Sequence, residues 1–351
     1  MGGLKSVERI AVAGVAVVTA VAGVARYAGW PVLVAFGAAT VALAGLAWVV
    51  SFSTEQVGER FSPAVTGVLQ STLGNLPELF VVIFALDAGQ VVVAQSSIIG
   101  SLFANALLVL GLVLVVGART AKDHVMRFHP RLSNDASTLL LVCVFIIVLV
   151  GLSLGSGDRA SHHVKAISAI GAIALLAVYL AWVVPYLRGG GSASEGGEPR
   201  IPLSFSLALL GLGGVASAFV SDWFVKALEP AILQLHVSPA FAGLVIVAIA
   251  GNAVENVAGV VFAAKGSSEL AISVVINSVA QIAAFLFPLL VLVSLVFATP
   301  LTFALAPIYI GALALTAVVV WQISGDGEAR AFEGWALMAI YVILAAITLY
   351  E

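Results

Sequence analysis

The chain has 351 residues, 62% of them hydrophobic and 9% charged, with a formal net charge of -3 and a mean hydropathy of +1.15. A soluble domain usually carries about a quarter charged residues, so this composition excludes a water-soluble globule and predicts a polytopic, all-α membrane protein. The single cysteine, Cys143, lies in an apolar run and excludes an internal disulfide framework.

About eleven apolar runs along the chain are long enough to cross a bilayer, which takes about 20 residues in a helix. We interpret the first run as a retained span rather than a signal peptide, because no polar domain follows it. The longest polar break, 187–200, is rich in Gly and Ser and predicts a flexible linker. The predicted spans are 8–27, 30–51, 62–86, 90–117, 136–154, 163–187, 202–226, 238–264, 268–298, 301–322 and 332–350.

The distribution of basic residues supports this series of spans. If the runs alternate in direction, 11 of the 15 Lys and Arg residues fall on the side of the N-terminus and 4 on the other side. Loops that stay in the cytoplasm carry the excess of Lys and Arg, so we expect a cytoplasmic N-terminus and an external C-terminus. The four on the far side are Arg26, Arg159, Lys165 and Lys226.

Polar residues recur at a nearly constant separation in the two halves of the chain. Each half has five spans after one extra helix, and because five is odd, the halves insert with opposite orientation, as in many secondary transporters. We therefore expect an extra helix over 1–29, a first inverted repeat over 30–187, a cytoplasmic linker over 188–201 and a second repeat over 202–351. The pairs, 177 or 176 residues apart, are Glu78 and Glu255, Asn75 and Asn252, Ser101 and Ser278, and Asn105 and Gln281.

The stretches "STLGNLPELF" and "AIAGNAVENVAG" each place a glutamate three residues after an asparagine in an apolar span. An ionised carboxylate at bilayer depth is costly, so Glu78 and Glu255 are candidate ligands of a transported cation. Asn75 would share a helix face with Glu78, and Pro77 would free a backbone carbonyl one turn earlier. The side chains at the paired positions offer oxygen atoms as metal ligands, and none of them is His or Cys. Hard cations such as Ca²⁺ prefer such a set of ligands, whereas Zn²⁺ and Cu⁺ do not.

The two glutamates also predict a coupling mechanism. Burial and neighbouring like charge favour the protonated acids, whereas a divalent cation favours the carboxylates. Protons and a cation would thus compete for one pair of side chains, which is the basis of exchange. The competing interpretation is that the polar side chains only hold helices together. Glu55 and Asp222, at the ends of spans two and seven, either attract cations to an entrance or are ordinary interfacial charges.

The motifs "GNLPEL" and "GNAVENVAG" resemble the paired signature repeats of the calcium/cation antiporter superfamily, and within it the calcium/proton exchanger (CAX) family. The resemblance covers essentially the whole chain. It implies two inverted five-helix repeats and export of cytosolic Ca²⁺ against inward proton flow. It further implies that Glu78 and Glu255 bind cation or protons and that six polar residues line the pathway: Asn75, Asn252, Ser101, Asn105, Ser278 and Gln281.

Some residues depart from the pattern of that family. Asn256 stands where calcium/proton exchangers often have His, and Asn277 stands where Gly is more frequent. The "LPEL" of 76–79 is similar to the sodium/calcium exchanger branch, but that branch tends to have an acid where this chain has Gln281. Sodium/calcium exchange, or antiport of another divalent cation such as Mn²⁺ or Mg²⁺, therefore stays open as an alternative.

Other classes of function fit the sequence poorly. The five histidines lie in loops or at span ends, so no metalloprotease motif or membrane-embedded base is formed, and we expect no enzyme activity. A channel usually builds its pore from a ring of subunits, whereas this chain carries its own repeat. We expect no cofactor, no nucleic-acid partner and a prokaryotic inner-membrane location; Ca²⁺, protons and the bilayer are the expected partners, and homo-oligomers are compatible with the sequence.

Overall fold

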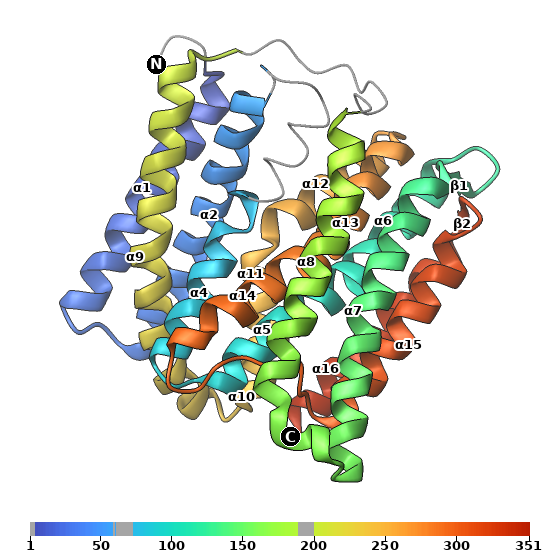
Figure 1. Ribbon diagram of the computed structural model, residues 1–351. Coiled ribbons are helices and arrows are strands. Elements are labelled where there is room, and N and C mark those ends of the chain that lie inside the picture. Colours follow the sequence, from blue (N-terminus) through green and yellow to red (C-terminus); the bar gives the residue numbers. More distant parts are fainter. Residues whose placement is uncertain (1–3, 59, 61–72, 189–199) are drawn as a thin grey trace. The chain divides into compact units, whose positions relative to one another are not determined.

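The computed structural model describes residues 4–58, 60, 73–188 and 200–351, and these residues are almost entirely helical (Figure 1). They form two compact units. Unit 1 comprises 1–88, 180–237 and 250–254, and unit 2 comprises 89–179, 238–249 and 255–351. Each unit takes segments from both halves of the chain, so this division is a different one from the division into repeats, which stays a prediction. Most of the predicted linker lies outside the described residues.

Unit 1 is built on two long helices, α2 (Val32–Gly58) and α9 (Leu203–Leu235), which pack against each other along their length. They are the first helices of the two predicted repeats. The extra helix α1 (Ser6–Tyr27) lies against both, and α4 (Leu76–Asp87) packs on α9 (Figure 1). Both long helices are mostly apolar, and their apolar residues are not confined to one face, as expected of helices that face lipid and protein at once.

Polar contacts join three segments at one end of unit 1. Arg200 pairs with Glu8 at 2.7 Å, and its backbone N–H donates to Gln56 Oε1 at 3.2 Å. Arg60 Nη2 donates to the Ile201 carbonyl at 2.7 Å, beside an apolar cluster that includes Leu4. The start of α1, the end of α2 and the end of the linker therefore lie on the same side, as the alternating spans predict.

Unit 2 holds most of the remaining helices. From the first half come α5 (Val91–Phe103), the π-helix η1 (Ala104–Val109), α6 (Leu110–Thr120), α7 (Pro130–Ser156), the 3₁₀ helix η2 (Arg159–His163) and most of α8 (Val164–Arg188). From the second half come α10 (Pro239–Phe241), the π-helix η3 (Ala242–Val247), parts of α11 (Ala248–Gly251) and α12 (Ala253–Ala264), α13 (Ser268–Gln281), the π-helix η4 (Ile282–Leu286), α14 (Phe287–Val293), the 3₁₀ helix η5 (Ser294–Val296), α15 (Pro307–Ser324) and α16 (Ala331–Leu349).

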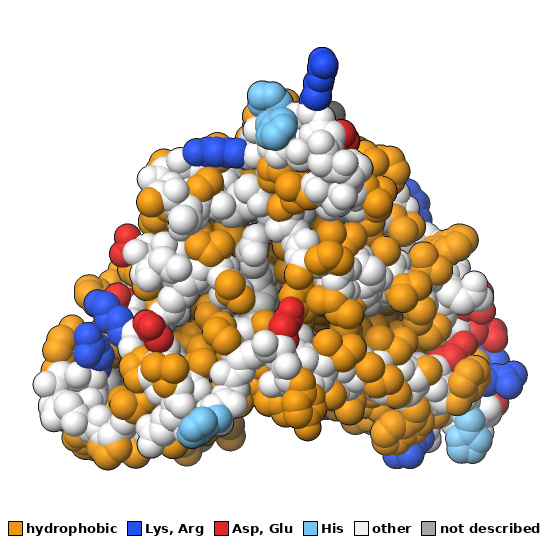
Figure 2. All heavy atoms as spheres, turned by 90° about the horizontal axis from the view of Figure 1, so that it is seen from below, with side chains coloured by type: hydrophobic (Ala, Val, Ile, Leu, Met, Phe, Trp, Pro, Cys, Tyr) orange, Lys and Arg blue, Asp and Glu red, His pale blue; other side chains and the backbone are white. Residues whose placement is uncertain are grey.

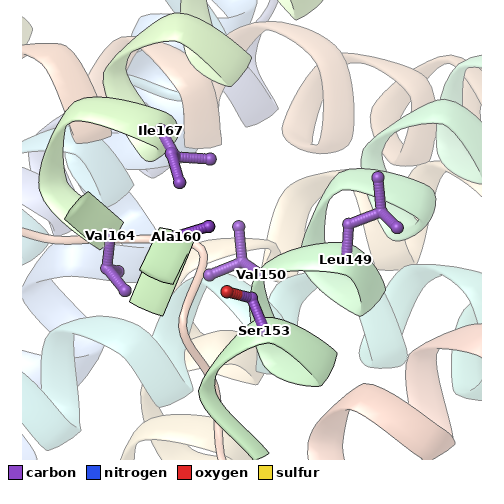
Figure 3. A pocket seen from close by; sticks show the side chains of 6 residues that line it. All are labelled: Leu149, Val150, Ser153, Ala160, Val164 and Ile167. Carbon is purple, nitrogen blue, oxygen red and sulfur yellow. The ribbon is translucent and has the colours of Figure 1, made fainter. Parts of the chain in front are cut away.

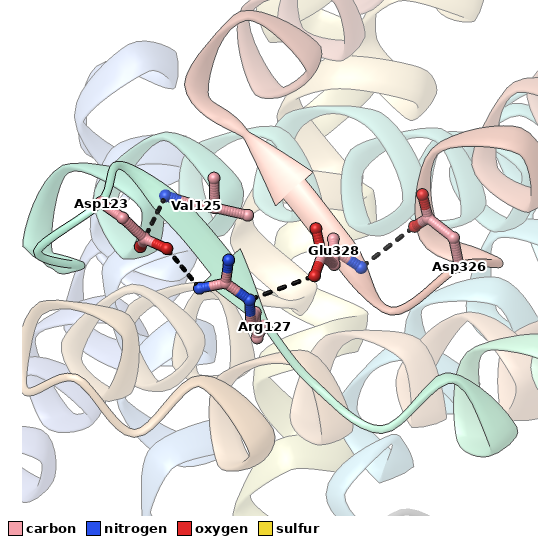
Figure 4. A network of polar contacts seen from close by, with 5 residues as sticks. All are labelled: Asp123, Val125, Arg127, Asp326 and Glu328. Atoms are coloured by element: carbon pink, nitrogen blue, oxygen red, sulfur yellow. Dashed lines mark hydrogen bonds and ion pairs between the residues drawn. The ribbon is translucent and has the colours of Figure 1, made fainter.

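A short sheet at one end of unit 2 is absent from the sequence prediction of an all-α fold. Strand β1 (Val125–Arg127) pairs antiparallel with β2 (Glu328–Arg330), in the register Met126 opposite Ala329. Arg127 bridges the strands, contacting Asp123 at 2.6 Å and Glu328 at 3.1 Å (Figure 4). The hydrogen bond from Arg127 holds the pKa of Asp123 below its ordinary value. The two strands thus join the loop before α7 to the loop before α16, and the alternating spans place both loops on the same side of the membrane.

Nine helices in the described part of the chain are long and apolar enough to cross a membrane. Many of their large hydrophobic side chains are exposed, including Phe145 at 62% and Leu212 at 70%, as in a protein whose solvent is lipid. The chain is an integral membrane protein. The predicted count of eleven is not confirmed, because spans 62–86 and 238–264 are absent from the nine. The first lies partly outside the described residues, and the second is broken into short segments.

Candidate functional site

The two glutamate motifs lie where helices are interrupted. Asn75 has a turn conformation between helical residues 73–74 and the start of α4 at Leu76. Asn252 is likewise a turn residue between α11 and α12. Glu78 and Glu255 therefore fall in the first turn of the helix that follows, near the partial positive charge of its N-terminus. The backbone of Glu255 is described, whereas its side chain lies outside the described part of the structure.

The break changes our interpretation of Pro77. In a continuous helix, proline would remove an interior hydrogen bond, but here Pro77 is in the first turn of α4, where the N–H groups have no partner within the helix. Asn75 and Glu78 are thus not on one continuous helix face. The helix restarts at Leu76, and the Asn75 carbonyl accepts from the Leu79 N–H at 2.9 Å.

Within unit 1, the two signature motifs come together. A Cβ placed on Gly251 would lie 3.9 Å from the Glu78 Cβ, so the end of α11 lies beside the start of α4. Asn75, Glu78 and Asn252 are all buried, with at most 5% of their surface exposed. The structure therefore brings the first-half carboxylate next to the second-half asparagine motif, as the repeat predicts.

Helix α9 adds two serines that sequence reasoning missed. Ser221 Oγ donates to the Pro77 carbonyl at 3.4 Å, and one turn earlier Ser217 is fully buried. The Ser217 hydroxyl makes no hydrogen bond among the described residues. Gly214, on the same face of α9, lies near Leu76. The sequence signal was weak, because isolated serines are common in membrane helices, and only the packing of α9 on α4 singles these two out.

Four further predicted residues lie in unit 2, and all are buried. Ser101 and Asn105 are on α5 and η1, and Ser278 and Gln281 are on α13. Asn105 Nδ2 donates to the Ser101 carbonyl at 3.0 Å. The Gln281 side-chain oxygen has no hydrogen-bond partner in the part of the chain that the structure describes. A buried amide oxygen of this kind is costly unless something else is bound to it.

The helices that carry these four residues pack reciprocally. Helix α13 contacts η1, and α5 contacts η4, which is the pattern that a pseudo-twofold relation between the halves produces. A π-helix also occurs at the same point of each half, starting at Ala104 in one and at Ile282 in the other. π-Helices are rare and are frequent at functional sites.

Close backbone contact holds α5 against η3. A Cβ on Gly100 would lie 2.5 Å from the Leu244 Cα, and one on Gly243 would lie 2.9 Å from the Val93 carbonyl oxygen. Small residues permit such approaches between membrane helices. In the second half, Asn277 replaces the glycine and its amide nitrogen lies 3.3 Å from Ser273 Oγ.

The two predicted entrance residues differ in environment. Asp222 pairs with Lys226 at 2.8 Å, one turn along α9, which fits an ordinary interfacial charge. Glu55 is exposed near the end of α2. Neither observation tests a role in attracting cations, so the entrance stays a prediction.

Each half of the chain has a broken helix with a carboxylate just after the break. Such paired broken helices are typical of secondary transporters. The comparisons give the family. The family described as "Sodium/calcium exchanger protein" matches residues 31–185 and 205–350, and the chain belongs to this family.

Two relatives and one solved structure illustrate the similarity. The chain is 30% identical over 324 residues to the Ca²⁺/H⁺ antiporter ChaA of Bacillus subtilis (strain 168), covering 90% of this chain and 92% of that protein. It is 30% identical over 321 residues to the vacuolar calcium ion transporter of Schizosaccharomyces pombe, covering 88% and 77%. The structure of native YfkE superimposes with a TM-score of 0.81 at 27% identity, covering 96% of this chain and 98% of that one.

Proposed function

We propose that this protein is an antiporter that exchanges Ca²⁺ for H⁺ across its membrane. The observation that carries the proposal is the paired position of Glu78 and Glu255, each in the first turn of a helix that begins directly after an asparagine. The named function of the Bacillus relative, which matches over nearly its whole length, supports the same ions. No enzyme activity is part of this proposal.

Glu78 and Glu255 would bind the cation and, in its absence, protons. Asn75, Asn252, Ser101, Asn105, Ser278 and Gln281 would supply the neutral oxygen ligands along the pathway, a donor set suited to Ca²⁺. Ca²⁺ and protons compete for the same carboxylates, so loading one releases the other. Alternating access would come from one helix bundle sliding against the helices that carry the glutamates. We further propose a prokaryotic inner membrane with a cytoplasmic N-terminus, which the uneven distribution of Lys and Arg supports.

Transport by purified protein in liposomes tests the proposal. With an imposed pH gradient and no Na⁺, we expect Ca²⁺ uptake that follows the gradient and stops when a proton ionophore dissipates it. Uptake that ignores the pH gradient and follows a Na⁺ gradient would replace the proton with Na⁺ as the counter-ion. The "LPEL" stretch of 76–79 favours that second candidate. Mn²⁺ and Mg²⁺, added as competitors, test the choice of divalent cation.

A further inference from the structure

The segment that joins α7 to α8, together with the first turn of α8, carries four basic or imidazole side chains within seven residues. Arg159, His162, His163 and Lys165 are all exposed. The neighbouring acid, Asp158, accepts hydrogen bonds from Ser153 Oγ at 2.6 Å and from the Ser161 N–H at 3.1 Å. These hydrogen bonds hold the pKa of Asp158 below its ordinary value. The carboxylate is thus engaged locally, and the segment offers more positive than negative charge to a ligand.

Three of the four side chains line one open groove. His162, His163 and Lys165 form it together with Ala166, Ala169 and Leu295, and its volume is about 400 Å³. Seen from below, histidine and basic side chains lie at several places around the edge of a largely hydrophobic face (Figure 2). The groove is therefore charged where α8 begins and apolar farther along that helix.

The apolar part of the groove continues as a stripe on α8. Ala166, Ala169, Ile170 and Ile173 are spaced as one face of a helix, and Ile170 and Ile173 are 67% and 59% exposed. Such a stripe can carry an extended hydrocarbon chain starting from the basic end. The combination matches an amphiphile whose anionic head and apolar tail are joined.

A second hollow on the same segment lacks this combination. It is about 140 Å³ and is lined by Leu149, Val150, Ser153, Ala160, Val164 and Ile167 (Figure 3). Its one polar side chain, Ser153, donates to Asp158. Without a charged group, this hollow selects no headgroup, and it serves as an internal comparison for the basic groove.

We propose that the basic groove binds an anionic phospholipid of the surrounding membrane. Its phosphate would lie among His162, His163 and Lys165, and one acyl chain would follow Ala166, Ala169 and Ile170. Each Lys or Arg near a membrane surface favours anionic lipid by about 1 kcal/mol, which is about fivefold in retention. The adjoining apolar stripe adds the burial of the chain. The site is independent of the exchange function.

Native mass spectrometry of the full chain tests the site. The protein in detergent is mixed with phosphatidylglycerol or phosphatidylcholine of the same acyl chains, and retained lipid is counted. We expect preferential retention of phosphatidylglycerol, reduced about fivefold by Lys165→Gln and preserved by Lys165→Arg. Ala169→Trp, which fills the apolar part without changing charge, should lower retention of both lipids. Arg26→Gln, an exposed cation in unit 1, is the matched control and should change nothing.

Three results would overturn the proposal. The first is equal retention of the two lipids by the unmodified protein. The second is a loss of phosphatidylglycerol in Arg26→Gln as large as in Lys165→Gln, which would indicate general surface charge. The third is complete displacement of the lipid by glycerol 3-phosphate, which would make this an anion site that does not recognise the chain.

Discussion

At the scale of single residues, the important feature is where each carboxylate sits on its helix. Glu78 is in the first turn of α4, buried, and close to the end of α11. The N-terminal peptide dipoles and the neighbouring amides offer this carboxylate the polar surroundings that lipid does not. Glu255 takes the corresponding position on α12. The proposed function has both carboxylates alternate between a bound proton and a bound cation.

Replacing either glutamate should abolish exchange. For Glu78→Gln and Glu255→Gln we expect a loss of pH-driven Ca²⁺ uptake of at least about a hundredfold, because even the loss of a residue that only orients a metal ligand costs 10- to 100-fold. Uptake in liposomes is the measurement. Asp87→Asn, exposed at the far end of α4, is the matched control and should transport normally. Full exchange by Glu255→Gln would contradict the site.

We predict that Ser221 contributes more weakly to cation binding, through its hydrogen bond to the Pro77 carbonyl. Ser221→Ala removes one neutral hydrogen bond to the Pro77 carbonyl, so we expect the apparent Ca²⁺ affinity to fall by about three- to tenfold. Ser221→Thr retains a hydroxyl and should recover most of the affinity. The concentration dependence of uptake gives the affinity. Ser204→Ala, on the exposed start of α9, is the control; an equal effect there would indicate a general change in the helix.

At the scale of elements, the fold depends on helices that are interrupted or locally widened. The spans that carry the glutamates contain breaks, and the spans that follow contain π-helices after Ser101 and Ser278. Such departures can free backbone carbonyls that an unbroken α-helix would satisfy internally. Glycines at the contact of α5 with η3 allow the altered helices to pack closely.

A methyl group at this contact should destabilise the protein. Gly100→Ala would place a Cβ 2.5 Å from the Leu244 backbone, and overpacking of this kind costs about 1–3 kcal/mol. Thermal unfolding in detergent should show a lower midpoint. Gly155→Ala is the matched control, because nothing lies within 4 Å of a Cβ there, and its midpoint should be unchanged or slightly higher. An unchanged midpoint for Gly100→Ala would contradict the close contact.

At the scale of the whole molecule, contacts between loops show which helix ends lie on the same side within each unit. The ends of α1, α2 and the linker are joined by Arg200 and Arg60 in unit 1. In unit 2, the sheet joins the loops 121–129 and 325–330, and the His129 N–H donates to Glu269 Oε2 at 2.8 Å. Within each unit, these contacts agree with the alternating series of spans.

Side-specific labelling checks this topology. In a Cys143→Ser background, Ser194→Cys and Asp326→Cys should react with a membrane-impermeant thiol reagent from the side of the N-terminus. Arg159→Cys should react from the opposite side. Sealed right-side-out and inverted vesicles distinguish the two faces. Labelling of Arg159→Cys and Asp326→Cys from one face would require an odd number of spans to be added or removed between them.

The sequence by itself determined the membrane class, the series of apolar runs and the pairing of Glu78 with Glu255, because hydropathy and a fixed separation of 177 residues are properties of the chain alone. It predicted unbroken spans through both motifs, because a single turn residue inside an apolar run does not change the hydropathy of that run enough to be detected. Tertiary structure decided the breaks at Asn75 and Asn252, the π-helices, the two-stranded sheet and the placement of Ser217 and Ser221 beside α4. These features depend on how backbone groups are satisfied and how closely helices approach, which only the folded chain defines.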